Sequence, residues 1–153
     1  VVMRASSFSQ TLVCHPKTGL KTVADLVGYA KQNPGRLNYG SGGNGSAGHL
    51  AGEMLKAQAG LFVVHIPYPG AGPALRDTVG GQVPIIFDNL PSALPHIQGK
   101  RLVAMAVASP VRVPELPDVP TFTEQGFGGI LLVGPGFREC RLGSFVQLGR
   151  ACD

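Results

Sequence analysis

Apolar and polar residues alternate along the chain in two periods, which predict strands and helices in turn. Short apolar runs typical of buried strands occupy 11–14, 37–39, 61–66, 83–87 and 102–107. Apolar residues spaced three and four apart predict helices at 23–30 and 47–55, and shorter helices follow at 73–79 and 91–97, the last limited by Pro95. Strands that alternate with helices across short connections predict an α/β fold. We expect an open, mostly parallel sheet covered by helices on both faces.

Local signals at the helix ends support this assignment. Thr22 and Asp25 have the spacing of a capping box, and the sequence Asn-Pro-Gly at 33–35 ends the helix that they begin. Ser46 is a favourable N-cap for the second helix. Pro73 suits the first position of the third helix, which the glycine pair at 80–81 ends.

A glycine- and serine-rich loop at 40–45 joins a predicted strand to the helix that Ser46 caps. Its glycines let the backbone turn sharply and approach a ligand. The unpaired N–H groups at the start of a helix, together with the helix dipole, attract anions, and Ser41, Asn44 and Ser46 add polar donors. No charged side chain is needed, so the loop suits a carboxylate. The alternative is that the glycines only form a tight turn.

Two more loops are predicted to end strands on the same side of the sheet. Tyr68 could present its phenol to a ligand, or pack with its hydroxyl in water. Asp88 could orient a ligand water or amine, or cap the next turn. His49 follows Ser46 closely and could assist, with Glu53 as its partner. The candidate ligand-binding residues are therefore Ser41, Gly42, Gly43, Asn44, Gly45, Ser46, His49, Tyr68 and Asp88.

The glycines at 43, 45 and 48 also match the dinucleotide-binding fingerprint between a strand and a helix. That fingerprint needs an acid at the end of the next strand to hold the ribose, and none occurs at 65–68. A dinucleotide-dependent oxidoreductase fragment is therefore the weaker alternative. The four histidines lack zinc spacing, and no nucleophile elbow is present, so we predict no metal, no cofactor and no catalytic residues.

Composition restricts the classes further. Of the 153 residues, 44% are hydrophobic and 14% charged, which argues against disorder. The net charge is +4, but the basic residues form no stripe, so nucleic-acid binding is not expected. There is neither a signal peptide at the start nor an apolar stretch of the roughly 20 residues that a membrane span needs. Cys14 reads as a buried small hydrophobe, whereas Cys140 and Cys152 could pair in an oxidising compartment.

Several of these segments together closely resemble the Bug (TctC-like) family of solute-binding receptors. They are NPGRLNYGS at 33–41, GNGSAGHLAGE at 43–53, HIPYPGAGPAL at 65–75, GGQV at 80–83, FDNLPS at 87–92 and LPDVPT at 116–121. The resemblance covers roughly residues 7–127. Because it rests on long motifs in order, it is more specific than a likeness of fold.

The resemblance implies a periplasmic receptor, not an enzyme, that serves a tripartite tricarboxylate-type transporter or a sensor. Such receptors grip a small carboxylate (a dicarboxylate, an amino acid or an aromatic acid) between two α/β lobes, a fold of the type II periplasmic binding protein kind. Residues 1–127 would be the second lobe, and 128–153 an atypical tail. With the first lobe expected before Val1, we predict weak binding and self-association through an exposed inter-lobe surface. A remnant that binds nothing is a further alternative.

Overall fold

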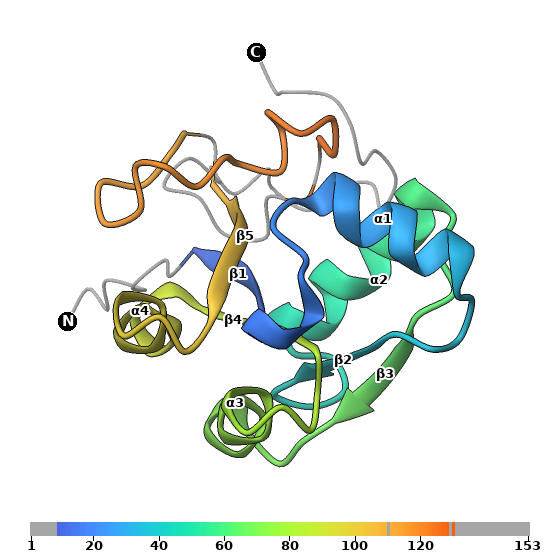
Figure 1. Cartoon of the computed structure of the whole chain (residues 1–153), viewed down its shortest axis with the longest axis horizontal. Coiled ribbons are helices and arrows are strands. Elements are labelled where there is room, and N and C mark those ends of the chain that lie inside the picture. Colours follow the sequence, from blue (N-terminus) through green and yellow to red (C-terminus); the bar gives the residue numbers. More distant parts are fainter. Residues whose placement is uncertain (1–8, 110, 129, 131–153) are drawn as a thin grey trace, which may run out of the picture.

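Helices and strands alternate along the chain, as the sequence predicts (Figure 1). The computed structural model describes residues 9–109, 111–128 and 130. The elements are β1 (Gln10–Cys14), a 3-10 turn (Pro16–Thr18), α1 (Val23–Gln32), β2 (Asn38–Ser41), α2 (Ala47–Ala59), β3 (Val64–Pro67), α3 (Ala71–Val79), β4 (Ile85–Asn89), α4 (Leu90–Gln98) and β5 (Val103–Ala108).

The strands form one five-stranded sheet in the order β3-β2-β4-β1-β5. β2 pairs in parallel with β3 and with β4, whereas β1 runs antiparallel to both of its neighbours, β4 and β5. Four strands therefore point the same way, and the predicted α/β class with a mostly parallel sheet is confirmed. The reversed strand β1, which lies between β4 and β5, makes the sheet mixed, and it brings Gln10 opposite Asn89, at the edge where the parallel strands end.

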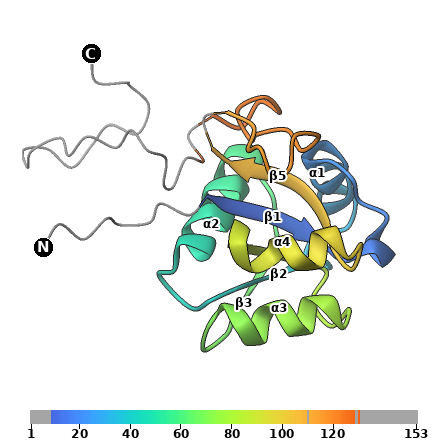
Figure 2. The same ribbon diagram turned by 90° about the vertical axis from the view of Figure 1, so that its left-hand side faces the viewer.

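Helices cover both faces of the sheet, each over its own apolar core (Figure 2). Leu12, Phe87 and Tyr39 pack under α1 and α2 in the larger core. Val13 and Ile86 point to the opposite face and pack under α3 and α4. Successive residues of a strand face opposite sides, so the near-continuous apolar runs of β1 and β4 are explained by burial on both faces.

Hydrogen bonds at the helix starts confirm two of the predicted caps. The Thr22 hydroxyl accepts from the Asp25 amide and the Asp25 carboxylate accepts from the Thr22 amide, which completes the capping box of α1. The Ser46 hydroxyl accepts from the His49 amide at the start of α2. Two details of the prediction were wrong. Pro73 is the third residue of α3, not the first, and α4 continues through Pro95, because so short a helix forgoes few backbone bonds at a proline.

The segment after β5 packs back onto the same domain. Thr121 forms a bridge with Val107 of β5, and Phe122 is buried in the larger core, 1% exposed. Cys14 is fully buried, as predicted, and its thiol donates to the carbonyl of Leu20. Residues 131–153, which include most of the tail and the other two cysteines, lie outside the described residues. No helix among the described residues is both long and apolar enough to cross a bilayer.

Two glycines in helix interiors give a matched test of this packing. A Cβ at Gly52 of α2 would lie 2.3 Å from the ring of Tyr39, whereas one at Gly28 of α1 would meet nothing within 4 Å. We expect Gly52→Ala to lower the free energy of unfolding by about 1–3 kcal/mol through overpacking. Gly28→Ala should raise it by up to about 1 kcal/mol through helix propensity. Urea unfolding of both variants measures this, and equal effects would contradict the packing described for α2.

Candidate anion-binding site

A cleft of about 90 Å³ opens at the edge of the sheet where the parallel strands end. This edge is the usual ligand site of open α/β sheets. The lining comes from the first residue of β1, the loop after β2, the end of β4 and the starts of α2 and α3: Gln10, Gly42, Ser46, Ala47, Gly48, Ala71, Phe87, Asp88 and Asn89. Segments far apart in the sequence thus build one site.

Three helices begin at this cleft. α2 starts at Ala47, α3 at Ala71, and α4 directly after Asn89. The first N–H groups of a helix have no intrahelical acceptor and carry the positive end of its dipole. Ser46 caps only the His49 amide, and Gly70 provides no side-chain cap for α3. At α4 the Leu90 amide donates to the carbonyl of Ser9 and Pro91 has no N–H, so the free donors belong to α2 and α3. In the part of the chain that the structure describes, no lysine, arginine or histidine lines the cleft. The arrangement therefore suits an anion held by neutral donors.

Close contacts fix two of these helix starts against the sheet. A Cβ on Gly48 would lie 2.6 Å from the carbonyl oxygen of Phe87, so α2 meets β4 at a distance that only glycine permits. A Cβ on Gly42 would lie 3.3 Å from the backbone nitrogen of Ala71 at the start of α3. These glycines were expected to let a ligand approach the backbone. They also set the positions of the two helix starts.

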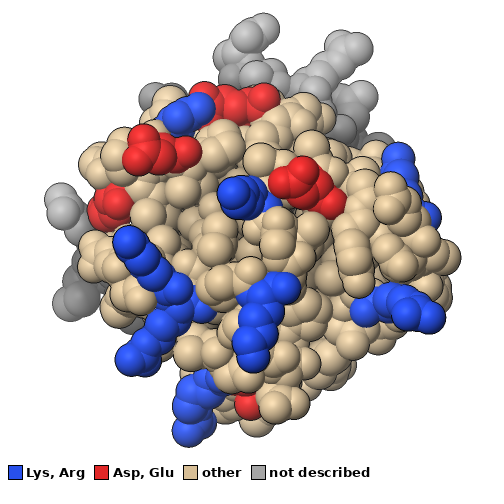
Figure 3. Space-filling model, viewed as in Figure 1, with Lys and Arg blue, Asp and Glu red and all other residues tan. Residues whose placement is uncertain are grey.

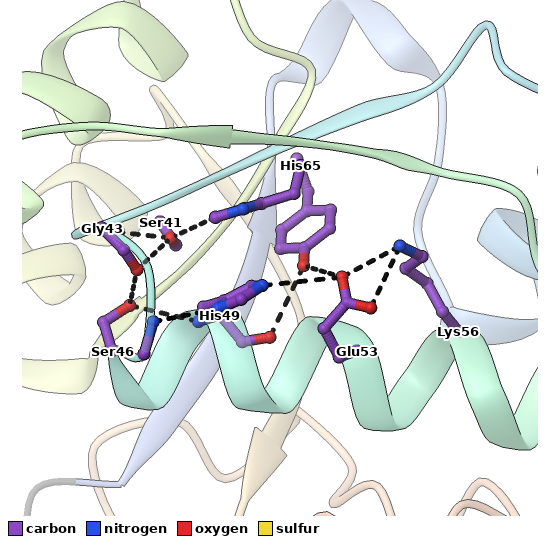
Figure 4. A network of polar contacts seen from close by, with 9 residues as sticks. Ser41, Gly43, Ser46, His49, Glu53, Lys56 and His65 are labelled. Atoms are coloured by element: carbon purple, nitrogen blue, oxygen red, sulfur yellow. Dashed lines mark hydrogen bonds and ion pairs between the residues drawn. The ribbon is translucent and has the colours of Figure 1, made fainter.

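The loop before α2 uses most of its own polar groups internally (Figure 4). The carbonyl of Gly43 lies 3.1 Å from the Ser41 hydroxyl and accepts from that of Ser46 at 2.8 Å. The Gly45 amide donates to Nδ1 of His49 at 3.0 Å. Ser41 is fully buried and also contacts Nε2 of His65. These bonds hold the loop in one shape, and they leave the donors for a ligand on the helix backbone.

A second group of polar contacts continues this network along α2 (Figure 4). The rings of His49 and His65 stack with centroids 4.1 Å apart. Glu53 accepts from the Tyr39 hydroxyl and from Lys56, and it pairs with His49 at 3.8 Å. Burial raises the pKa of the Tyr39 phenol, and Glu53 raises it further. Burial, together with the charge of His49, lowers the pKa of His65. The neutral imidazole is therefore favoured at His65.

Asp88 is the one ionisable side chain among the described residues that line the cleft. It is 2% exposed, and its Oδ2 has no hydrogen-bond partner among the described residues. Burial raises the pKa of its carboxyl to about 6, against a smaller lowering by the Asn89 amide. Thr11 lies opposite on β1, buried, with its own hydroxyl unpartnered. An acid without a partner in a cleft is typical of a functional position.

The structure brings together Gly42, Ser46 and Asp88 of the residues proposed from the sequence. Asn44 and Gly45 are exposed outside the lining, and the Tyr68 hydroxyl donates to Asp77 at 2.8 Å. The roles of Ser41, Gly43, His49, Tyr68 and the other candidates in ligand binding stay predictions. Sequence reasoning missed Gln10, Ala47, Gly48, Ala71, Phe87 and Asn89. Ala47 and Gly48 carried a signal, because the sequence predicted unpaired N–H groups at the start of the helix that Ser46 caps.

No cluster of three or more potential metal ligands occurs among the described residues. β3, the strand that follows α2, ends at Pro67, so it lacks the acid that a dinucleotide ribose would need. On the face shown in Figure 3, basic side chains are spread over much of the surface, whereas most acidic ones lie in the upper half and one lies at the lower edge. That face carries no continuous basic stripe of the kind that nucleic-acid binding requires.

The model of the "Tripartite tricarboxylate transporter family receptor" matches residues 1–135. BugT of Bordetella pertussis is 36% identical over 116 residues, 76% of this chain and 36% of that protein. A solved periplasmic transporter superimposes with a TM-score of 0.78 at 43% identity, over 82% of this chain and 43% of its own. An R. palustris protein solved with adipate gives 0.77 at 36% identity, over 80% and 41%. The chain thus spans well under half the length of these relatives.

The ionisation of Asp88 should be visible in the stability of the protein. Its pKa rises from 3.8 to about 6 on folding, so the folded state favours the protonated acid. The stability this gives is complete below the unfolded pKa and is lost as the pH rises through about 6. We therefore expect Asp88→Asn to raise the free energy of unfolding by about 1–3 kcal/mol at pH near 7.5 and to change it little near pH 4.

Urea unfolding at the two pH values measures this difference. Asp118→Asn, which removes an exposed carboxylate, is the matched control and should have little effect at either pH. A gain for Asp88→Asn that is the same at both pH values would show that desolvation of the charge is not its cause.

Proposed function

This chain belongs to the tripartite tricarboxylate transporter receptor family, and from that membership we propose that its cleft binds one carboxylate group of a small organic acid. The family consists of solute-binding receptors, and the resemblance to Bug proteins predicted from the sequence motifs is confirmed by the family match and by BugT.

One observation carries the proposal: the N-termini of α2 and α3 meet at a cleft where no described residue of the lining is cationic. α4 also begins there, but the Leu90 amide donates to the carbonyl of Ser9 and Pro91 has no N–H. Backbone N–H groups at fixed positions hold a carboxylate with directed hydrogen bonds and require no mobile charged side chain. The adipate in the R. palustris relative is a ligand of this chemical class. Adipate is therefore the first compound to test.

The wider role follows from the family and extends beyond the residues described. We propose that residues 1–127 act as the second lobe of a two-lobed periplasmic receptor, with 128–153 as an atypical tail, and that this receptor delivers carboxylates to the membrane subunits of a tripartite tricarboxylate-type transporter. A single lobe buries only part of a ligand, so we expect millimolar rather than micromolar binding by this chain.

Self-association is a separate prediction. Five large apolar side chains are exposed among the described residues: Tyr29, Leu50, Phe62, Val64 and Val111. Phe62 is 67% exposed and lies just before the edge strand β3, whose outer backbone groups have no neighbouring strand. An apolar edge of this kind favours contact with a second protein surface.

The carboxylate site can be tested by titrating the ¹⁵N-labelled chain with adipate and following the amide resonances by NMR. We expect saturable shifts at Gly42, Ala47, Gly48 and Ala71. Ala47→Pro removes one N–H at the first position of α2, where proline is tolerated and Ser46 already has an extended backbone. It should weaken binding about tenfold or more, the usual effect of losing a hydrogen bond to a charged group.

Ala47→Gly keeps the N–H and provides the matched comparison. Circular dichroism of both variants checks that the helix is retained. Shifts confined to residues outside the cleft, or equal affinity of the proline and glycine variants, would contradict a carboxylate held at the start of α2.

A further inference from the structure

The position of Asp88 poses a problem of charge for the proposed carboxylate site. Among the described residues it is the one acid that lines a cleft suited to anions, it is buried, and its Oδ2 has no partner. No cationic side chain among these lining residues offsets it. Two carboxylates that share a half-enclosed site repel each other, and one of them then holds a proton.

We propose that Asp88 receives the ligand as a neutral acid: the O–H of its Oδ2 donates to a carboxylate oxygen, so that binding takes up one proton. This inference rests on the proposed function, because it needs a carboxylate in the cleft. The proton comes from solvent, stays on Oδ2 in the complex and returns to solvent when the ligand leaves. The site thereby binds its carboxylate ligand only together with one proton on Asp88.

The surroundings of Oδ2 support this assignment. A neutral acid needs one acceptor, and the incoming carboxylate supplies it, whereas a ligand ammonium needs up to three acceptors. Two polar side chains of the lining are already engaged: the Gln10 amide donates to the side-chain Oδ1 of Asn89, and the Ser46 hydroxyl donates to Gly43. The Thr11 hydroxyl opposite Asp88 is unpartnered, but it offers a single oxygen. Burial has already raised the pKa of Asp88 to about 6 in the free protein, so one further proton is bound at small cost near neutral pH.

The other titratable groups on the elements around Asp88 lie elsewhere and have their own partners or positions. On α2, His49, Glu53 and Lys56 form the network beside His65. On α3, Asp77 accepts from Tyr68, and Arg76 is exposed. On α4, His96 lies in the last turn, at the opposite end of the helix from Asn89. On β1, Cys14 is four residues from Gln10, at the other end of the strand. A pH dependence of binding between about 6.5 and 8.5 is therefore assigned to Asp88.

The test is the NMR titration with adipate at several pH values from about 6.5 to 8.5, a range in which adipate keeps both its charges. For the unmodified chain, the dissociation constant should rise by a factor that approaches tenfold per pH unit. For Asp88→Asn, whose amide donates without titrating, it should change less than about twofold over the range and be lower than that of the unmodified chain at the highest pH. Asp118→Asn should behave as the unmodified chain does.

A parallel titration with 2-aminoadipate separates the proton from a ligand ammonium. If Asp88 binds an ammonium, this compound binds more tightly than adipate at pH 8.5 and Asp88→Asn weakens it, which overturns the proposal. Two further results overturn the proposal: adipate binding that is independent of pH in the unmodified chain, and a pH dependence that survives Asp88→Asn. A fixed water between Asp88 and Thr11 would make adipate binding independent of pH. If neither the unmodified chain nor Asp88→Asn binds adipate, the proposed function is overturned as well.

Discussion

The site depends on the close approach of α2 to the sheet, which two glycines permit. Gly48 lies against the carbonyl of Phe87, and Gly52 against the ring of Tyr39. A side chain at either position would push the helix away from β2 and β4, and its first N–H groups would then move away from the end of β4, where Asp88 lies. The same contact buries Tyr39 and Phe87 edge to face in the larger core. Core packing and site geometry are therefore one constraint, and the ligand groups belong to elements that the core already holds in place.

The reversed direction of β1 is the second determinant of the cleft. In a wholly parallel sheet, the strand beside β4 would end at this edge, and its first residue would lie at the far side. Because β1 runs the other way, its first residue, Gln10, reaches the cleft and bonds to Asn89 at the start of α4. Thr11 then faces Asp88 across the strand pair. The polar wall around the acid is thus a product of topology.

The close contact of α2 with the sheet and the reversed direction of β1 explain which features could be predicted from the sequence. The helical and strand periods, the caps of α1 and α2 and the loop before α2 depend on neighbours in sequence, so they could be predicted, and Asp88 could be placed at a strand end. Gln10 and Ala71 could not be found, because the direction of a strand and the meeting of two helix starts depend on contacts between distant segments. The reading of the serines as donors overlooked competition inside the loop: the Ser46 hydroxyl donates to Gly43, and the Ser41 hydroxyl contacts both Gly43 and His65.

The hydrogen bonds inside the loop before α2 reduce the conformational freedom that the loop can lose when a ligand binds. A loop of glycines would lose much conformational freedom on closing around a ligand, and binding would have to offset that loss. Here the hydroxyls of Ser41 and Ser46, together with the imidazole of His49, already hold the loop through bonds of its own. The ring of His49 stacks on that of His65, and burial together with the charge of His49 lowers the pKa of His65. The polar side chains of the loop therefore serve to fix its shape, so that recognition is left to the backbone N–H groups and to Asp88, whose positions the sheet sets before any ligand arrives.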